Sequence, residues 1–105
     1  MRSAIHQSVL VRTKPDKLAD MKKLIVDLAK HVQETEPGML QYEYFEGEDS
    51  EGHIIIIQET YGNQAAFDFH HESEYYRTAS KIFVEWLAAP VEILRLTPIA
   101  GFGSR

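Results

Sequence analysis

Residues 53–61, HIIIIQETY, are the most informative stretch of this sequence for predicting the fold. Four consecutive β-branched residues followed by a polar end are typical of a β-strand. Successive side chains of a strand point to opposite faces, so Ile54 and Ile56 lie on one face, and Ile55 and Ile57 on the other. A sheet with helices on one side usually exposes a polar second face. Here both faces are apolar at the centre of the strand, so other parts of the protein must shield each face from water.

The flanking residues predict the other elements. Strands are expected over 5–12 (IHQSVLVR), 39–46 (MLQYEYFE) and 91–97 (VEILRLT), each bounded by turn-forming residues. A helix is expected to begin near Pro15 and end at Pro37-Gly38, because apolar residues recur at steps of three and four: Leu18, Met21, Ile25, Leu28 and Val32.

After the isoleucine strand, Asn63 and Ser73 are good N-caps, for a short helix and for a longer one that ends before Pro90. Residues 47–52 are polar, with glycine at both ends, and predict a hairpin turn. The order β-α-β-β-α-β predicts an α+β, ferredoxin-like split βαβ fold, with an antiparallel sheet and helices on one face. We expect a single domain over residues 1–105.

The second face of the sheet predicts a partner. Two main helices cover only one face, and leaving isoleucines exposed on the other forgoes roughly 1.5–3 kcal/mol each. Since most soluble oligomers are symmetric, we expect a homodimer through the sheet face. The alternative is a monomer with a modest exposed patch. The tail 98–105 (PIAGFGSR) is expected to be mobile or packed at this interface.

Composition excludes several classes of function. The formal net charge of −5 disfavours binding to a nucleic-acid backbone. The absence of cysteine removes disulfides and thiolate metal sites and fits a reducing cytoplasm. The sequence has neither a signal-peptide pattern nor an apolar run long enough to span a membrane, so we expect a cytoplasmic protein.

Residues 38–78, GMLQYEYFEGEDSEGHIIIIQETYGNQAAFDFHHESEYYRT, carry a family resemblance. Glu36-Pro37-Gly38 resembles an "EPG" turn, Glu59 precedes the aromatic Tyr61 by two residues, and a histidine is followed by Ser73 and Tyr76. This layout resembles the antibiotic biosynthesis monooxygenase (ABM) family, the dimeric α+β barrels. Its pattern is most similar to the small quinol monooxygenases and the autoinducer-2 phosphate isomerases, and the similarity extends from residue 9 to residue 96.

His70 is the histidine that matches the family pattern. The resemblance implies a general base, which an imidazole with a pKa near 6.5 can be. Phe67 and His70 are three residues apart and share the buried side of their helix. His71 is rotated by about 100°, so we expect only one of the two histidines to point into a pocket. The alternative for His70 is a structural residue bonded to the backbone.

Glu59 is the second catalytic candidate, as a carboxylate that orients the imidazole of His70. Its alternative is a salt bridge with Arg12 or Arg95. The substrate-binding candidates are aromatic residues and one strand hydroxyl: Tyr61, Tyr76, Phe67, Phe83 and Ser8. For the aromatic residues the alternative is packing in the core. Tyr42 and Tyr44 share one strand face, and the sequence leaves open whether they meet the substrate or a partner subunit.

The resemblance implies a cofactor-independent monooxygenase that acts on a small quinol, phenolic or polyketide-like aromatic substrate. Molecular oxygen would be the co-substrate, and no metal or cofactor is expected. The histidine ligand of the family's haem-degrading branch is matched here by Ser80. The first alternative is an isomerase of a small hydroxyketone phosphate, with the phosphate held by basic residues: Arg12, Arg77, Lys81 and Arg95. The second alternative is a dimeric module that binds a ligand without turnover.

Overall fold

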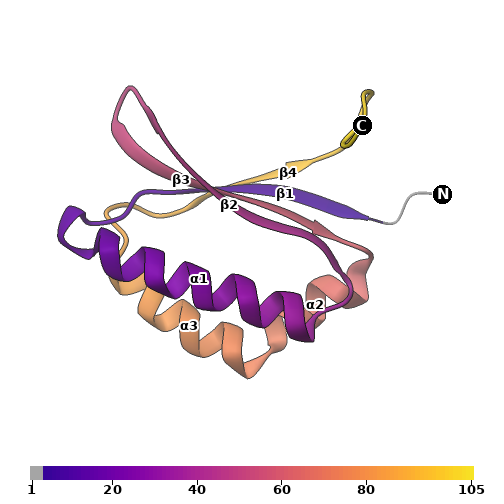
Figure 1. Ribbon diagram of the computed structural model, residues 1–105, viewed down its shortest axis with the longest axis horizontal. Helices are drawn as coiled ribbons and strands as arrows, with labels where there is room; N and C mark the ends of the chain where they lie inside the picture. Colours follow the sequence, from indigo (N-terminus) through magenta and orange to yellow (C-terminus); the bar gives the residue numbers. More distant parts are fainter. Residues whose placement is uncertain (1–3) are drawn as a thin grey trace.

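The computed structural model describes residues 4–105. A four-stranded antiparallel sheet carries its α-helices on one face (Figure 1). The elements follow in the order β1 (Ile5–Val11), a 3-10 turn (Pro15–Lys17), α1 (Leu18–Thr35), β2 (Met39–Asp49), β3 (Gly52–Tyr61), α2 (Gln64–Glu72), α3 (Glu74–Glu85) and β4 (Glu92–Leu96). The α+β, ferredoxin-like prediction is confirmed.

The sheet has the strand order β2-β3-β1-β4, so β3 and β1 lie at its centre. In the register, Gln7 of β1 pairs with Glu59 of β3 on one side and with Arg95 of β4 on the other. Tyr42 of β2 pairs with Glu59 from the other edge of β3. Four strands therefore bring polar and aromatic residues to one level of the sheet.

The core forms where α1 packs on the sheet. Met21, Ile25, Leu28 and Val32 of α1 are buried, as the apolar stripe predicted. They face residues of the central strands that are also buried: Val9, Val11, Ile55 and Ile57. The buried members of β1 and β3 have the same strand parity, which identifies the face that the helices cover.

Two caps divide the second helical segment, as predicted. The Asn63 side chain accepts a hydrogen bond from the backbone N–H of Ala66 at 2.9 Å and begins α2. The Ser73 hydroxyl accepts one from the N–H of Tyr76 at 3.1 Å and begins α3. Ser73 itself is extended, with φ −66° and ψ 144°, so the chain turns between the two helices. This turn allows α2 and α3 to border the same cavity.

The hairpin between β2 and β3 differs from its prediction. The sequence placed a six-residue turn at 47–52, whereas β2 continues to Asp49, which pairs with Gly52. Gly52 has φ +118°, a conformation that favours glycine, so one glycine suffices for the tight turn. The long hairpin is stabilised at its end by an ion pair between Arg12 and Asp49.

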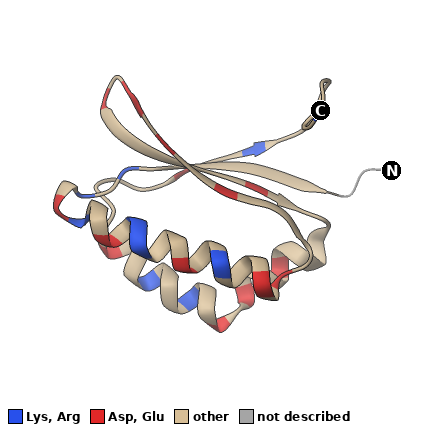
Figure 2. Ribbon diagram, in the orientation of Figure 1, with Lys and Arg blue, Asp and Glu red and all other residues tan. Residues whose placement is uncertain are grey.

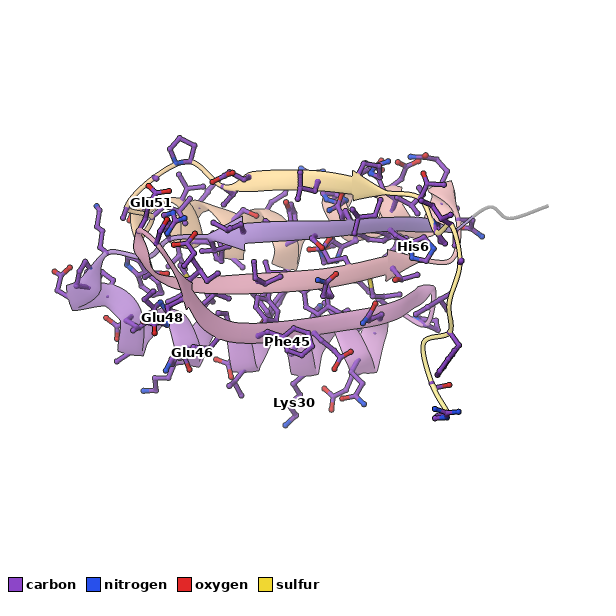
Figure 3. The ribbon with its side chains drawn as sticks, turned by 90° about the horizontal axis from the view of Figure 1, so that it is seen from above. His6, Lys30, Phe45, Glu46, Glu48 and Glu51 are labelled. Atoms are coloured by element: carbon purple, nitrogen blue, oxygen red, sulfur yellow. The ribbon has the colours of Figure 1, made fainter. Side chains whose placement is uncertain are left out.

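The second face of the sheet is uncovered and largely apolar near its centre. Figure 3 views the molecule onto this face, with β2, β3, β1 and β4 side by side above the helices. Phe45 is 49% exposed, Leu94 61% and Leu96 44%. Ile54 and Ile56 lie between them on β3. No helix within residues 4–105 has the length and apolarity needed to cross a membrane.

Candidate active site

A cavity of about 210 Å³ lies between the helix-covered face of the sheet and the helices α2 and α3. One end, the acceptor end, is formed by Gln7, Glu59, His70 and His71. The other end, the apolar end, is formed by Phe83, Val84, Leu87, Val91 and Ile93. Val84 is 63% exposed and Ile93 58% exposed, so the cavity opens toward solvent between α3 and the edge strand β4. A ligand would enter with its apolar part nearest the mouth.

His70 is held rigidly at the acceptor end. The residue is 2% exposed, and its Nδ1 lies 2.9 Å and 3.2 Å from the two carboxylate oxygens of Glu36. Among residues 4–105 no protein atom hydrogen-bonds to Nε2, and the side chain lines the cavity. Burial lowers the pKa of His70 to about 4, so the imidazole is neutral at pH 7. With Nδ1–H donated to Glu36, Nε2 presents a lone pair to the cavity.

Glu36 takes the role that the sequence assigned to Glu59. It is the C-cap of α1 and is 6% exposed, and burial raises its pKa above the usual 4.5. A carboxylate at a helix C-terminus faces the negative end of the helix dipole, so this position is unfavourable without a partner. The unfavourable position of an acidic residue at the end of a predicted helix was the sign in the sequence that Glu36 has a partner. The sequence had indicated Glu36 only as part of a turn.

Glu59 lines the cavity together with His70, but its hydrogen-bond partners are Gln7 and Tyr61. Its Oε1 accepts hydrogen bonds from Gln7 Nε2 at 2.7 Å and from the Tyr61 hydroxyl at 2.6 Å. Both donors converge on one oxygen, and within the described part of the chain Oε2 has no partner. Burial, followed by the nearby carboxylate, raises the pKa of Tyr61. The alternative for Glu59, a salt bridge with Arg12 or Arg95, is absent among residues 4–105, because Arg12 binds Asp49 and Arg95 lies over the Phe67 ring at 5.3 Å.

Tyr42 and Tyr44 line the cavity, so they lie on the helix-covered side of the sheet and not on its uncovered face. Their hydroxyl groups are hydrogen-bonded to each other at 2.5 Å. Burial raises the pKa of both phenols, so they stay protonated. The ring of Tyr42 lies edge-on to His70, with 5.6 Å between the centroids. The tyrosines thus form a rigid wall beside the imidazole.

The prediction that His71 points away from the pocket is wrong. Both histidines line the cavity, and their ring centroids are 5.1 Å apart. The 100° rotation holds for the Cα–Cβ directions, but the His71 ring folds back along the helix, where its Nδ1 lies 2.8 Å from the Phe67 carbonyl oxygen. A carbonyl only accepts, so Nδ1 carries a proton, and in the neutral imidazole Nε2 is then an acceptor.

The structure distributes the predicted substrate-binding residues over three places. Tyr76 and Phe83 line the cavity. Tyr61 and Phe67 stand behind the lining, with Tyr61 fully buried and its ring 4.9 Å from that of Phe67. Ser8 lies on the uncovered face, where its hydroxyl donates to Gln58 at 2.8 Å.

Ser8 therefore requires a correction. Neighbouring residues of a strand face opposite sides of the sheet, so the β1 residue at the cavity is Gln7. Gln7 shares its strand parity with Val9 and Val11, and the structure shows that these two residues face the helices. That any of these residues binds or converts a substrate remains a prediction.

The fold and the cavity define a class of protein: a ferredoxin-like α+β domain with a cavity between an antiparallel sheet and its helices. Residues 4–82 match the profile of the antibiotic biosynthesis monooxygenase family. The match spans most of the chain, and the protein therefore belongs to the ABM family, whose fold is typical of dimeric α+β barrels.

Solved structures agree with this assignment. A candidate antibiotic biosynthesis monooxygenase from Caulobacter crescentus CB15 superimposes with a TM-score of 0.85 at 25% identity, covering 94% of this chain and 92% of that one. A Mycobacterium tuberculosis protein superimposes with a TM-score of 0.82 at 22% identity, covering 96% of this chain and 100% of that one. The second likeness shows the fold alone.

Among curated sequences, an uncharacterized protein of Synechocystis sp. is 30% identical over 83 residues. The alignment covers 79% of this chain and 55% of that protein. The chain thus spans little more than half the length of this relative.

Proposed function

We propose that this protein oxidises a small quinol or phenolic ring with molecular oxygen, without a cofactor, and that His70 is the general base. The observation that carries the proposal is the buried, neutral imidazole, fixed by Glu36 at Nδ1 and facing a mainly apolar cavity with Nε2. A phenol is hard to oxidise while protonated and becomes electron-rich once a base removes its proton.

The Glu36–His70 pair suits this proton transfer. The phenolic O–H of the substrate donates its proton to Nε2, and the resulting imidazolium lies 2.9 Å from the Glu36 carboxylate. The pair is then neutral overall, which a buried site favours over a net charge. The deprotonated ring then reacts with oxygen. For a quinol the reaction balances as quinol plus O₂ to hydroxyquinone plus water, with the quinol supplying the electrons.

The walls of the cavity support the same chemistry. The acceptor end holds the reactive groups, while aliphatic and aromatic residues on α3 and β4 form the rest and limit access of water. A volume of about 210 Å³ exceeds that of a benzene-binding cavity, which is roughly 150 Å³. We therefore expect a substrate of one ring or two fused rings.

The isomerase alternative receives less support. A phosphate needs converging basic groups, and within residues 4–105 no Lys or Arg lines the cavity. The binding-module alternative is decided by the assay below, in which it predicts binding without oxygen uptake.

We also propose that two copies pair through the uncovered sheet face. Apolar side chains, among them Phe45, Ile56 and Leu94, lie together at the centre of this face. A contiguous apolar patch of this kind is typical of an interaction surface. The cytoplasmic location likewise stays a prediction, and fractionation of cells tests it.

The test is oxygen uptake with a panel of one- and two-ring quinols. We expect His70→Ala to abolish uptake above the uncatalysed rate while light scattering shows an unchanged assembly. His53→Ala, which removes an imidazole at the hairpin, is the matched control and should retain full uptake. Unchanged uptake by His70→Ala would remove His70 from the mechanism. Uptake by neither wild type nor variant, with binding intact, would support the non-catalytic module.

A further inference from the structure

Among the described residues, three acceptor atoms at the acceptor end of the cavity have no protein partner. Within residues 4–105 neither Nε2 of His70 nor Oε2 of Glu59 is hydrogen-bonded by the protein, although the residues are only 2% and 7% exposed. Nε2 of His71 is the third. All three residues line the cavity, so a ligand bound there, or water in its absence, can supply the missing donors.

The charge at the acceptor end restricts which ligands can supply those donors. Glu59 is an acidic residue whose Oε1 accepts hydrogen bonds from Gln7 and Tyr61, which leaves Oε2 to face a ligand. Within the part of the chain that the structure describes, no Lys or Arg side chain lines the cavity to balance it. The basic residues lie mainly along α1 and α3 and in the segment before α1, with one on β4 (Figure 2).

We propose that Glu59 is a specificity-determining residue that accepts a hydrogen bond from the ligand and excludes anionic ligands. The cavity then selects an uncharged ring with at least two hydroxyl or amino donors on its inner side. It rejects rings that carry a carboxylate or phosphate there.

This inference deepens the proposed function, since it names the charge and the donor pattern of the substrate of the same site. It differs from the role that the sequence suggested for Glu59, because Glu36 already orients His70. A like charge held at ~5 Å, in surroundings with an effective dielectric constant near 20, weakens binding by roughly 100-fold. The loss of hydrogen-bond donors from a ligand weakens binding by about 10-fold or more, because buried acceptors stay unpaired.

The experiment measures binding by calorimetry, without oxygen, so turnover is not required. The probes are three naphthalenes of similar shape: 2,7-dihydroxynaphthalene, 2,7-dimethoxynaphthalene and 7-hydroxy-2-naphthoate. We expect the diol to bind wild type most tightly, the dimethoxy compound about 10-fold or more weakly, and the carboxylate roughly 100-fold more weakly. Glu59→Gln should reduce the preference for the diol over the carboxylate by at least about 10-fold.

Tyr61→Phe is the matched control. It removes one donor to the same Glu59 oxygen without changing the charge, so the preference for the diol should persist. Circular dichroism and thermal unfolding confirm that each variant is folded before titration, and Glu59→Ala replaces Glu59→Gln if the latter does not fold.

Three outcomes overturn the inference: equal affinity of wild type for the diol and the carboxylate, an undiminished preference in folded Glu59→Gln, or no binding of any probe at millimolar concentration. The proposed function fails separately. A protein that prefers the diol but consumes no oxygen retains the charge selection and loses the monooxygenase assignment.

Discussion

The buried Glu36–His70 pair makes a quantitative prediction about stability and pH. Burial lowers the pKa of His70 from 6.5 to about 4, so between these values the unfolded chain binds a proton that the folded chain does not. Stability linked to His70 is therefore full above pH 6.5 and falls as the pH drops toward 4. Proton linkage over this interval gives a loss of about 2 kcal/mol between pH 7.5 and pH 5.0.

Glu36 acts in the opposite direction. Its pKa is raised above 4.5 by burial, so the folded chain binds a proton that the unfolded chain releases, and stability linked to Glu36 increases as the pH falls through its folded pKa. In wild type the two contributions partly cancel. The His70 contribution is isolated by comparing Glu36→Gln with the double variant Glu36→Gln/His70→Gln, in which neither group titrates.

Urea unfolding at fixed protein concentration, at pH 7.5 and pH 5.0, provides the measurement. Glu36→Gln should lose about 2 kcal/mol more than the double variant on acidification. His70→Gln alone should change in the opposite direction, because only Glu36 remains. Exposed carboxylates contribute equally to Glu36→Gln and to the double variant, so their effect cancels in this comparison. Equal losses in Glu36→Gln and the double variant would refute the claim that burial keeps His70 neutral.

Two further predictions concern packing. Gly38→Ala should destabilise the protein by about 1–3 kcal/mol, because a Cβ there would lie 2.7 Å from the Ala66 Cβ, whereas Gly47→Ala, with nothing within 4 Å, should be well tolerated in the same thermal or urea unfolding experiment. Ile56→Glu should convert the proposed dimer into a 12.1 kDa monomer in light scattering, while Val26→Glu, on the exposed side of α1, should not, and a wild type that is itself monomeric would contradict the proposed pairing.

Much of the fold could be predicted from the sequence, because it depends on local patterns. The three- and four-residue spacing of apolar residues predicted α1, and the caps Asn63 and Ser73 predicted where α2 and α3 begin. Both kinds of pattern depend on residues only three or four positions apart, so they can be recognised without knowing the tertiary structure. The turn of the β2–β3 hairpin was placed too early, because polar residues with glycine fit a strand end and a loop equally well.

The inward position of His70 was also a local property, since it follows from the helical spacing to Phe67. Its partner was not, because Glu36 lies 34 residues earlier in the chain and meets His70 only when the tertiary fold brings the end of α1 beside α2. Strand alternation separated Gln7 from Ser8 but did not by itself say which of them faced the helices. Local residue patterns were enough to predict the elements and their order. Tertiary packing determined which carboxylate holds the imidazole and which strand residue reaches the cavity, because both depend on contacts between segments that are distant in the chain.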